Sequence, residues 1–478
     1  MLKAGFADTC ITPPPGEEIP GLFERRYAAG VYDPLYARAA VVDDGERCVA
    51  LVQVDAIVVA EDLVAGARKQ ANALCGIPPE NCFIGATHTH SGGPVFSAFE
   101  SEGDTGYAAF VAQQIAAAIT EAHRVRRPAL AGSEADNAEG VAFNRRFIMK
   151  DGTQRTHPGR MNPDIVEPAG PADPTVTVAG FRAPDNFRPF GCIVNFACHG
   201  THMNGYLYSA DYPRWIVDSL QAVYGPDFGV VFLNGACGDV TQVDNRTQRP
   251  SEFGPYWCER TGRAVGGAAI EALARMDYYG EVTVARKAAI VSAAIRAITP
   301  EALEAARALL AGTSVKGANQ EIGVPGKDIE TIYAQELLKV EAMRAEKPGR
   351  DLEIAGIRIA DALFWGVPAE FFQAFALEVR AASPFRHTCC VELANGYDGY
   401  ICTKAAFKGG GYEIRTARSS FLEEDAGENI VAAMTNLSKE MYADAQAEIQ
   451  SLPERKVWPG SEDSALDGIK KLTTKPTG

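Results

Sequence analysis

The chain has 478 residues, of which 46% are hydrophobic and 22% charged, an ordinary composition for a globular protein. Its formal net charge of −15 argues against a general nucleic-acid partner, because an acidic chain cannot neutralise a phosphate backbone. No apolar run reaches the length of a membrane span, so we expect no transmembrane segment.

The N-terminus and the cysteines predict a cytoplasmic protein. The opening stretch, MLKAGFADTCITPPPG, contains one lysine but no apolar core of a signal peptide, so we expect no cleaved secretion signal. The 11 cysteines are scattered along the chain without a CxxC pair. Such a pattern is typical of reduced thiols in a cytoplasm.

The first third of the chain alternates between strand-like and helical segments. We expect strands at 48–58 and 81–86, where the sequence is apolar, and helices at 60–75 and 105–125. Residues 133–190 are rich in Pro, Asp, Asn and Arg and show little periodicity. We expect them to form a long surface excursion with a functional role.

The rest of the chain continues the alternation of strands and helices. The predicted elements are, in order, strand 191–200, a helix from Pro213, strand 228–240, helix 257–275, strand 282–294, helices 300–312 and 328–346, strand 353–366, a helix from near Pro368, strand 387–394 and helix 421–449. The pattern predicts a large mixed α/β sandwich whose central sheet is flanked by helices. We expect one domain over 1–451 and a polar tail, 452–478.

Two histidines follow the predicted strand 81–86, in the stretch GATHTHSGGP. His88 and His90 are two residues apart, so in an extended segment their imidazoles face the same side. Open α/β sheets place their sites at the carboxyl ends of strands, and a pair of neutral imidazoles is a usual start for a zinc site. Taken alone, the pair is explained equally well by two loop histidines bound to backbone groups.

A second histidine cluster follows the predicted strand 191–200, in NFACHGTHM. It contains His199 and His202, so the two clusters hold four of the 7 histidines. Locally, His199 also fits a buried histidine with satisfied hydrogen bonds. Two known metal patterns do not fit. A metallo-β-lactamase needs HxHxDH, whereas Ser-Gly-Gly follows His90, and an amidohydrolase barrel needs an eightfold βα rhythm that the chain lacks.

Six segments resemble, in order, the catalytic domain of the neutral/alkaline non-lysosomal ceramidase family. They are AGFADTCITPPPG, GATHTHSGGP, NFACHGTHM followed by SADYP, LNGACGDVT, VPAEF and NGYDGYICTKAAFKGGGYE. Members of this family are zinc amidases that cleave the amide of N-acylsphingosine. The resemblance therefore implies the neutral-ceramidase fold and a Zn²⁺ cofactor. The C-terminal immunoglobulin-like domain of the family is not expected, because this chain ends too soon to hold it.

The resemblance implies a set of four zinc ligands: His88, His199, Glu370 and Tyr400. Two imidazoles, a carboxylate and a phenol oxygen form a donor set that suits Zn²⁺. From the sequence alone, Glu370 fits equally well as a carboxylate at the N-terminus of a helix. Tyr400, without the resemblance, reads as a half-buried strand aromatic.

The resemblance also implies how the remaining polar residues act. His90 stands beside a ligand and is the implied general acid/base. Arg145 is implied to hold the oxygen of the substrate, with its neighbour Arg146 as the rival for this role. Tyr412 would steady the oxyanion. Thr241 falls where the family has a serine, so it is a candidate pocket residue, although a turn-capping role explains it equally well.

Some segments depart from the family where the substrate would bind. AAFKGGG before Tyr412 differs from the family pattern, and His202 has no counterpart. We therefore predict a zinc-dependent amidase that cleaves a non-peptide C–N bond in a small soluble amide rather than in ceramide. A zinc esterase, lactonase or deacetylase acting on a carbohydrate derivative remains the alternative, as does a binding protein without catalysis. The sequence leaves the oligomeric state open, and a homo-oligomer is compatible with it.

Overall fold

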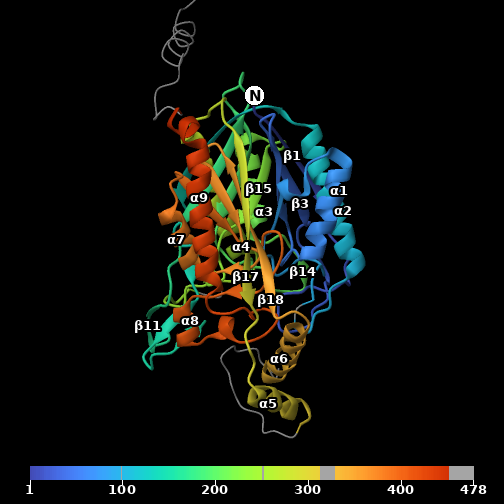
Figure 1. The fold of residues 1–478 in the computed structure, drawn as a ribbon, viewed down its shortest axis with the longest axis vertical. Coiled ribbons are helices and arrows are strands. Elements are labelled where there is room, and N and C mark those ends of the chain that lie inside the picture. The colour runs from blue at the N-terminus through green and yellow to red at the C-terminus, as the bar shows by residue number, and fades with distance from the viewer. Residues whose placement is uncertain (98, 250–251, 313–328, 452–478) are drawn as a thin grey trace, which may run out of the picture.

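The computed structural model describes residues 1–97, 99–249, 252–312 and 329–451. It has a mixed α/β fold, which confirms the predicted class. Within these residues, most strands belong to three large sheets, and each sheet is covered by helices on its outer side (Figure 1). The predicted tail, 452–478, lies outside the described residues.

The three large sheets are built from successive parts of the chain. Sheet one has the strand order β5-β4-β3-β1-β6, with β1 (Lys3–Cys10), β3 (Tyr36–Asp43), β4 (Cys48–Val54), β5 (Cys82–Ala86) and β6 (Arg127–Pro128). Sheet two has the order β15-β13-β12-β7, with β7 (Leu130–Asn137), β12 (Thr175–Arg182), β13 (Pro189–Phe196) and β15 (Gly229–Asn234). Sheet three has the order β17-β18-β19-β21, with β17 (Val284–Ala294), β18 (Gly349–Ile359), β19 (Ala362–Gly366) and β21 (His387–Val391).

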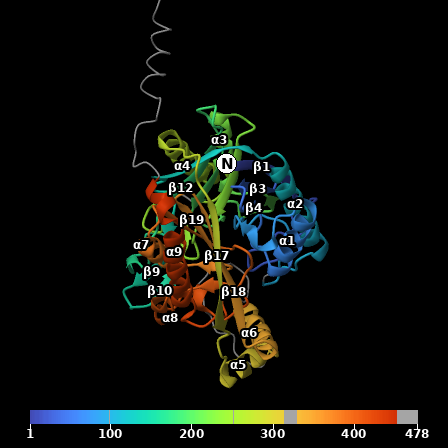
Figure 2. The ribbon, with the colours of Figure 1, turned by 45° about the horizontal axis from the view of Figure 1, so that its top comes forward.

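A pair of helices covers each large sheet, as Figure 2 shows. The pairs are α1 (Glu61–Cys75) with α2 (Thr105–Arg124), α3 (Tyr212–Tyr224) with α4 (Pro255–Arg275), and α7 (Gln373–Ala382) with α9 (Ala426–Ser451). Helix α2 illustrates the local code. Val111, Ile115 and Ile119 recur every four residues and are buried, and the Asp104 carboxylate caps the helix by accepting the Tyr107 backbone N–H at 2.7 Å.

The inner faces of the three sheets meet in one apolar core. Leu51 of sheet one, Ile193 of sheet two and Phe364 of sheet three belong to the same cluster and are fully buried. Sheets one and two approach so closely that a Cβ added at Gly229 would lie 2.2 Å from Cγ of Phe6. Glycine is needed at that position because the Phe6 ring occupies the space of any side chain.

Each large sheet contains one parallel βαβ unit. The units are β4–α1–β5, β13–α3–β15 and β19–α7–β21. The second strands of these units are edge strands that approach one another, through isolated bridges between Gly85 and Ala394 and between Gly235 and Val391. Because parallel strands point the same way, the loops that follow them emerge in one region.

Short elements complete the described chain. They are β2 (Gly30–Val31), β8 (Phe143–Asn144), β9 (Arg146–Met149), β10 (Gln154–Thr156), β11 (Ile165–Pro168), β14 (Leu207–Tyr208), β16 (Val240–Thr241), β20 (Glu370–Phe371), β22 (Tyr400–Ile401), the 3₁₀ turns η1 (Pro79–Asn81) and η2 (Tyr412–Ile414), and helices α5 (Pro300–Leu310), α6 (Ile329–Glu346) and α8 (Lys404–Gly409). Helices α5 and α6 project from one end of the body (Figure 1). None of the described helices combines the length and the apolar character that a membrane crossing requires.

The predicted elements were correct where the sequence is periodic and wrong where it is not. No strand was predicted before residue 48, yet β1 and β3 lie there, and the expected excursion at 133–190 contains β7 and β12, two strands of sheet two. The predicted strand 353–366 is a hairpin that turns at Ala360, whose φ is +55°. Pro368 begins no helix, because the chain first forms β20 and only then α7.

One buried hydrogen bond between sheet three and α9 provides a test of how their packing stabilises the protein. The Trp365 indole N–H donates to Ser438 Oγ at 2.9 Å, and both residues are fully buried. We expect Ser438→Ala to lower the free energy of unfolding by about 1–3 kcal/mol in chemical denaturation, because the indole N–H loses its partner. The control is Ser292→Ala, which removes an exposed hydroxyl bound to Asp351 and should change stability by less than about 0.5 kcal/mol. Equal effects in the two variants would contradict this account.

Candidate metal centre

The three βαβ units each deliver one side chain to a common site. His88 follows β5, His199 follows β13 and Glu370 follows β19, and all three are buried. The loops after β5 and β13 are joined by a bridge between Thr89 and Gly200. A Cβ at Gly200 would lie 2.5 Å from the His88 carbonyl oxygen, so this approach requires glycine.

Three imidazoles converge at the site. His88, His90 and His199 have ring nitrogens that all lie within 4.8 Å of one another. The Nε2 atoms of His88 and His90 are 3.4 Å apart. His88 has a φ of +63°, a left-handed backbone that is strained for a residue with a Cβ. Such strain persists only where the surroundings enforce it, and it is common at functional sites.

Backbone carbonyls fix the tautomer of each imidazole. The Nδ1 atoms of His88, His90 and His199 lie 2.8, 2.8 and 2.7 Å from the carbonyl oxygens of Ile57, Gly21 and Cys237. A carbonyl oxygen only accepts hydrogen bonds, so each Nδ1 carries the proton and each Nε2 keeps a free lone pair. This is the arrangement that metal-binding histidines use to orient their rings.

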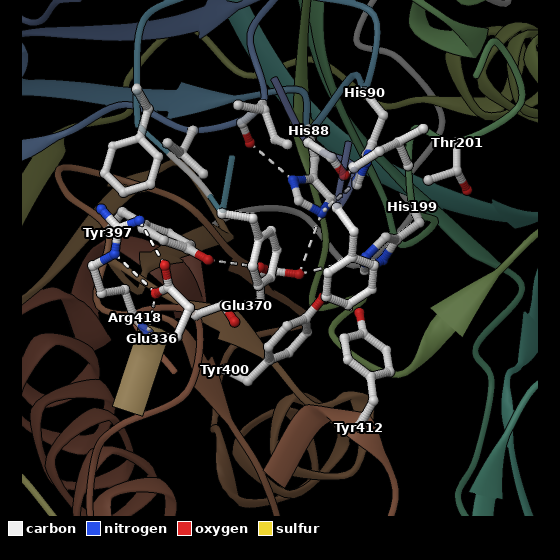
Figure 3. A pocket seen from close by; sticks show the side chains of 18 of the residues that line it. His88, His90, His199, Thr201, Glu336, Glu370, Tyr397, Tyr400, Tyr412 and Arg418 are labelled. Carbon is white, nitrogen blue, oxygen red and sulfur yellow. Dashed lines mark hydrogen bonds and ion pairs between the residues drawn. The ribbon is translucent and has the colours of Figure 1, made fainter. Parts of the chain in front are cut away.

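Glu370 places a carboxylate oxygen between two of the imidazoles (Figure 3). Its Oε2 lies 3.3 Å from His88 Nε2 and 3.4 Å from His199 Nε2, and its Oε1 accepts the Tyr397 hydroxyl at 3.0 Å. Oε2 of Glu370 and Nε2 of His199 are buried and have no hydrogen-bond partner among the described residues. The carboxylate and the lone pair lack a positively charged partner, and a cation between them would supply it.

The protonation states agree with this need. Burial lowers the pKa of His199 to about 3, with help from the charges of Arg145 and His88, and burial together with His88 and His199 holds the pKa of His90 well below its usual value. Burial also lowers the pKa of His88, but the Glu370 carboxylate outweighs it and the net pKa is raised. The carboxylate therefore attracts positive charge to this point.

The distances fit a tetrahedral divalent cation. Ligand atoms at about 2.0–2.2 Å from a tetrahedral ion lie about 3.3–3.6 Å from one another. The contacts of Glu370 Oε2 with the two imidazoles, at 3.3 and 3.4 Å, match this separation. Imidazole and carboxylate ligands suit a borderline divalent ion.

Two tyrosines, Tyr400 and Tyr412, face the cluster from the opposite side (Figure 3), and Arg145 contacts both of them. The hydroxyls of Tyr400 and Tyr412 are 2.6 Å apart, and Arg145 Nη2 donates to them at 3.1 and 3.0 Å. Burial and the nearby Glu370 raise the pKa of Tyr400, and burial also raises the pKa of Tyr412. Both phenols are therefore neutral donors as long as no cation binds them.

The two adjacent arginines have different environments. Arg145 lines the cavity, whereas Arg146 points away from it and donates to Gln154 Oε1 at 2.9 Å. Both pair with Glu413, which is fully buried and also accepts the Thr156 hydroxyl at 2.7 Å. Burial would raise the pKa of Glu413, but Arg146 and Arg145 outweigh it and lower the pKa.

Thr241 lies behind the cavity wall. It belongs to β16, and its hydroxyl donates to Gln242 Oε1 at 2.8 Å. The same oxygen accepts the hydroxyl of Thr201 at 2.9 Å, and Thr201 lines the cavity whereas Thr241 does not. Thr241 thus contacts the site through Gln242.

His202 belongs to a separate buried network. Its Nδ1 lies 2.7 Å from Asp211 Oδ1 and its Nε2 lies 2.9 Å from Thr261 Oγ1. The order carboxylate, imidazole, hydroxyl matches that of a hydrolytic triad, but all three residues are buried away from the cavity. The network joins the loop after β13 to the beginning of α3 and to α4.

The cavity above the cluster has a volume of about 320 Å³ and two unlike walls. The apolar wall comprises Leu22, Phe23, Val58, Phe96 and Phe99. The polar wall includes Arg145, Thr156, His157, Thr201 and Tyr412. An ion pair between Arg418 and Glu336 of α6 also contributes to the lining.

Sequence reasoning missed three features of the cavity. Tyr397 could have been predicted, because it lies three residues before Tyr400 in the same segment, NGYDGY. His157 had only the weak signal of a histidine before a Pro-Gly turn. Glu336 had none, because its place in the cavity depends on how α6 meets the body.

Comparison with solved structures supplies an independent measure of the fold. The neutral ceramidase from Pseudomonas aeruginosa superposes with a TM-score of 0.68 at 19% identity, over 93% of this chain and 75% of that one. A ceramidase complexed with C2 gives 0.68 at 20% identity, over 96% of this chain and 77% of that one. The fold is that of the neutral ceramidases. No protein-family model and no curated protein sequence matches the chain.

The buried cluster of Glu413, Arg145 and Arg146 makes a contribution to the free energy of unfolding that can be measured. We expect Glu413→Gln to lower the free energy of unfolding by about 3–5 kcal/mol at neutral pH, because Arg145 and Arg146 lose their shared buried carboxylate. A carboxyl group whose pKa is lower in the folded than in the unfolded protein stabilises the fold at pH values above its unfolded-state pKa. This stabilisation is lost as the pH falls through the folded-state pKa. The difference from wild type should therefore shrink in acid.

The matched control for this variant is Glu134→Gln. Glu134 pairs with Arg386, whose side chain is 41% exposed, so solvent screens the pair. We expect a loss of at most about 1 kcal/mol by the same denaturation measurement. A Glu413→Gln loss as small as that of the control would contradict the assigned role of Glu413.

Proposed function

We propose that this protein is a zinc-dependent amidase that hydrolyses a non-peptide C–N bond in a small soluble amide. The observation that carries the proposal is the convergence of His88, His199 and Glu370 on one point at the floor of a cavity. The cavity volume of about 320 Å³ lies at the lower end of the range for small-molecule sites, which supports a small substrate. Both structural neighbours are ceramidases, which act on an amide.

In this proposal, His88, His199, Glu370 and Tyr400 hold the zinc ion. Glu370 Oε2 lies 3.3 and 3.4 Å from the Nε2 atoms of His88 and His199, a separation that suits ligands of one ion, and the Tyr400 hydroxyl faces them from the opposite side. When bound, a zinc ion lowers the pKa of a water ligand towards 7 and polarises a carbonyl oxygen. The Tyr397 hydroxyl holds the other oxygen of Glu370 and so fixes the direction of the carboxylate.

His90 is proposed to move the proton. Its Nδ1 is held by the Gly21 carbonyl, and its low pKa keeps Nε2 unprotonated at neutral pH. Nε2 would therefore accept a proton from the attacking water beside His88 and deliver it to the nitrogen of the leaving amine. Hydrolysis in this way releases a carboxylate and an amine.

Arg145 and Tyr412 are proposed to stabilise the oxygen of the scissile carbonyl. Arg145 is buried and held by Glu413 and by the Gly238 carbonyl at 2.7 Å, so its charge stays in place during the reaction. Tyr412 offers a neutral hydroxyl at the same point. Donors fixed before the reaction stabilise negative charge as it develops on oxygen. Thr241 would support this wall through Gln242.

The free thiols favour a location in a reducing compartment such as the cytoplasm. All 11 cysteines of the sequence are described, and each is a free thiol. Disulfides are rare where cellular reductants keep thiols reduced. We therefore propose a cytoplasmic location.

The ligand assignment is tested by removing one imidazole. We expect His88→Ala to lose bound zinc, measured by elemental analysis, and to lose amidase activity by at least about a thousandfold. The matched control is His123→Ala, which removes an imidazole from α2 far along the chain from the cluster and should retain both. Unchanged zinc content in His88→Ala would refute the assignment.

The role of His90 is tested by separating metal content from rate. We expect His90→Ala to keep its zinc and to turn over about 100–10,000-fold more slowly, because positioned proton transfer contributes a factor of that size. Loss of zinc in His90→Ala would instead identify His90 as a third imidazole ligand. The Nε2 atoms of His90 and His88 are 3.4 Å apart, so His90 is close enough to bind the same ion, and the zinc content of His90→Ala distinguishes the two roles.

A further inference from the structure

His157 is the cavity histidine for which the proposed mechanism has no use. It follows β10, and its backbone N–H donates to the Arg145 carbonyl at 2.9 Å, so the two residues are neighbours across the β9–β10 hairpin. Cross-strand neighbours project to the same side of a hairpin. Arg145 projects towards Tyr400 and Tyr412, and His157 lines the same cavity.

One nitrogen of His157 is held and the other is free to meet a ligand. His157 is an exposed residue whose side chain lines the cavity, and its Nδ1 lies 3.2 Å from Asn245 Oδ1. Desolvation by nearby protein atoms and the charge of Arg145 lower the pKa of His157 to about 4, so the ring is neutral at neutral pH. With Nδ1–H donated to Asn245, Nε2 is left as an acceptor on a side chain that lines the cavity.

The backbone at His157 indicates that this orientation is enforced. Its φ is +47°, in the left-handed region that favours glycine and disfavours other residues. The surrounding loop is fixed by the Met161 N–H, which donates to the Asn245 carbonyl at 2.7 Å, and by an ion pair between Arg160 and Glu252 at 3.2 Å. A strained histidine that is held at the wall of a cavity is a candidate for recognition.

We propose that His157 is a specificity-determining residue whose Nε2 accepts a hydrogen bond from an N–H or O–H on the amine side of the substrate. The inference rests on the proposed function and deepens it. The lining also includes apolar side chains, so in this proposal an acyl group packs against Phe23, Phe96 and their neighbours while the amine side lies along the polar residues. A cavity-facing acceptor selects substrates that carry a donor, because a substrate without one leaves the acceptor unpaired.

Two donors are available on that side of an amide, and three probes distinguish them. The scissile N–H is tested by N-propylhexanamide against propyl hexanoate, which has the same shape without the N–H. A hydroxyl is tested by N-(2-hydroxyethyl)hexanamide against N-propylhexanamide. Each comparison is a ratio of kcat/KM values, so the intrinsic reactivity of the bond cancels between wild type and variant.

We expect His157→Phe to reduce at least one of these two ratios by about 10–100-fold, with the zinc content unchanged. The ratio that falls identifies the donor. His157→Gln, whose amide reaches the position of Nε2, should restore part of the ratio. His157→Asn suits a left-handed backbone but is too short to reach, so it provides the same test if the phenylalanine variant folds poorly. Thr153→Val, in the same hairpin but outside the cavity lining, should leave both ratios unchanged.

The outcomes separate this inference from the proposed function. If wild type hydrolyses the probes and both ratios stay within twofold in His157→Phe and His157→Asn, the role of His157 is overturned and the amidase stands. If zinc-loaded wild type hydrolyses none of the three probes, the amidase proposal is overturned together with this inference. A loss of zinc in His157→Asn would also overturn the assignment, because it would make His157 part of the metal centre.

Discussion

The site depends on one buried contact, that of Glu370 Oε2 with the Nε2 atoms of His88 and His199, at 3.3 and 3.4 Å. Each of the three side chains lies just after a strand of a different large sheet. A carboxylate oxygen and an imidazole lone pair that are buried without donors are unfavourable unless a cation joins them. The contact therefore brings together side chains that follow strands of all three large sheets, and these side chains form the candidate metal site.

The surroundings of this contact hold it in place through backbone groups. Glu392 is fully buried and accepts the backbone N–H groups of Cys237 at 2.8 Å and Phe371 at 3.1 Å. The Cys237 carbonyl in turn accepts the Nδ1–H of His199, and Phe371 follows Glu370. One carboxylate thus positions the neighbours of two proposed ligands. Burial raises the pKa of Glu392 to about 7, because the charged carboxylate is unfavourable away from solvent.

The lining of the cavity combines two kinds of side chain, which the proposed amidase would use for the two sides of its substrate. Phe23, Phe96 and Phe99 offer an apolar surface, while Arg145, His157 and Tyr412 offer hydrogen-bonding groups. The buried Glu413 carboxylate pairs with Arg145 and holds its charge in place.

The sequence alone determined the local elements and the chemistry of single segments. Helix α2, with its apolar residues every four positions, and β5, followed by His88 and His90, are encoded by periodicity and by residue type over a short stretch. The order of the motifs also indicated the neutral-ceramidase fold, which the structural comparison confirms. Strands β1 and β12 escaped prediction, because their sequences become strands only through pairing with partners distant in the chain.

Only the tertiary structure decided which side chains meet. That Arg145 and not Arg146 faces the cavity follows from the β9–β10 hairpin and the position of Glu413. That His202 joins Asp211 and Thr261 in a buried network, while His157 reaches the cavity, follows from loop paths that no local pattern encodes. The physical reason is that residue type sets what a side chain can bind, whereas the meeting of three sheets sets its partners.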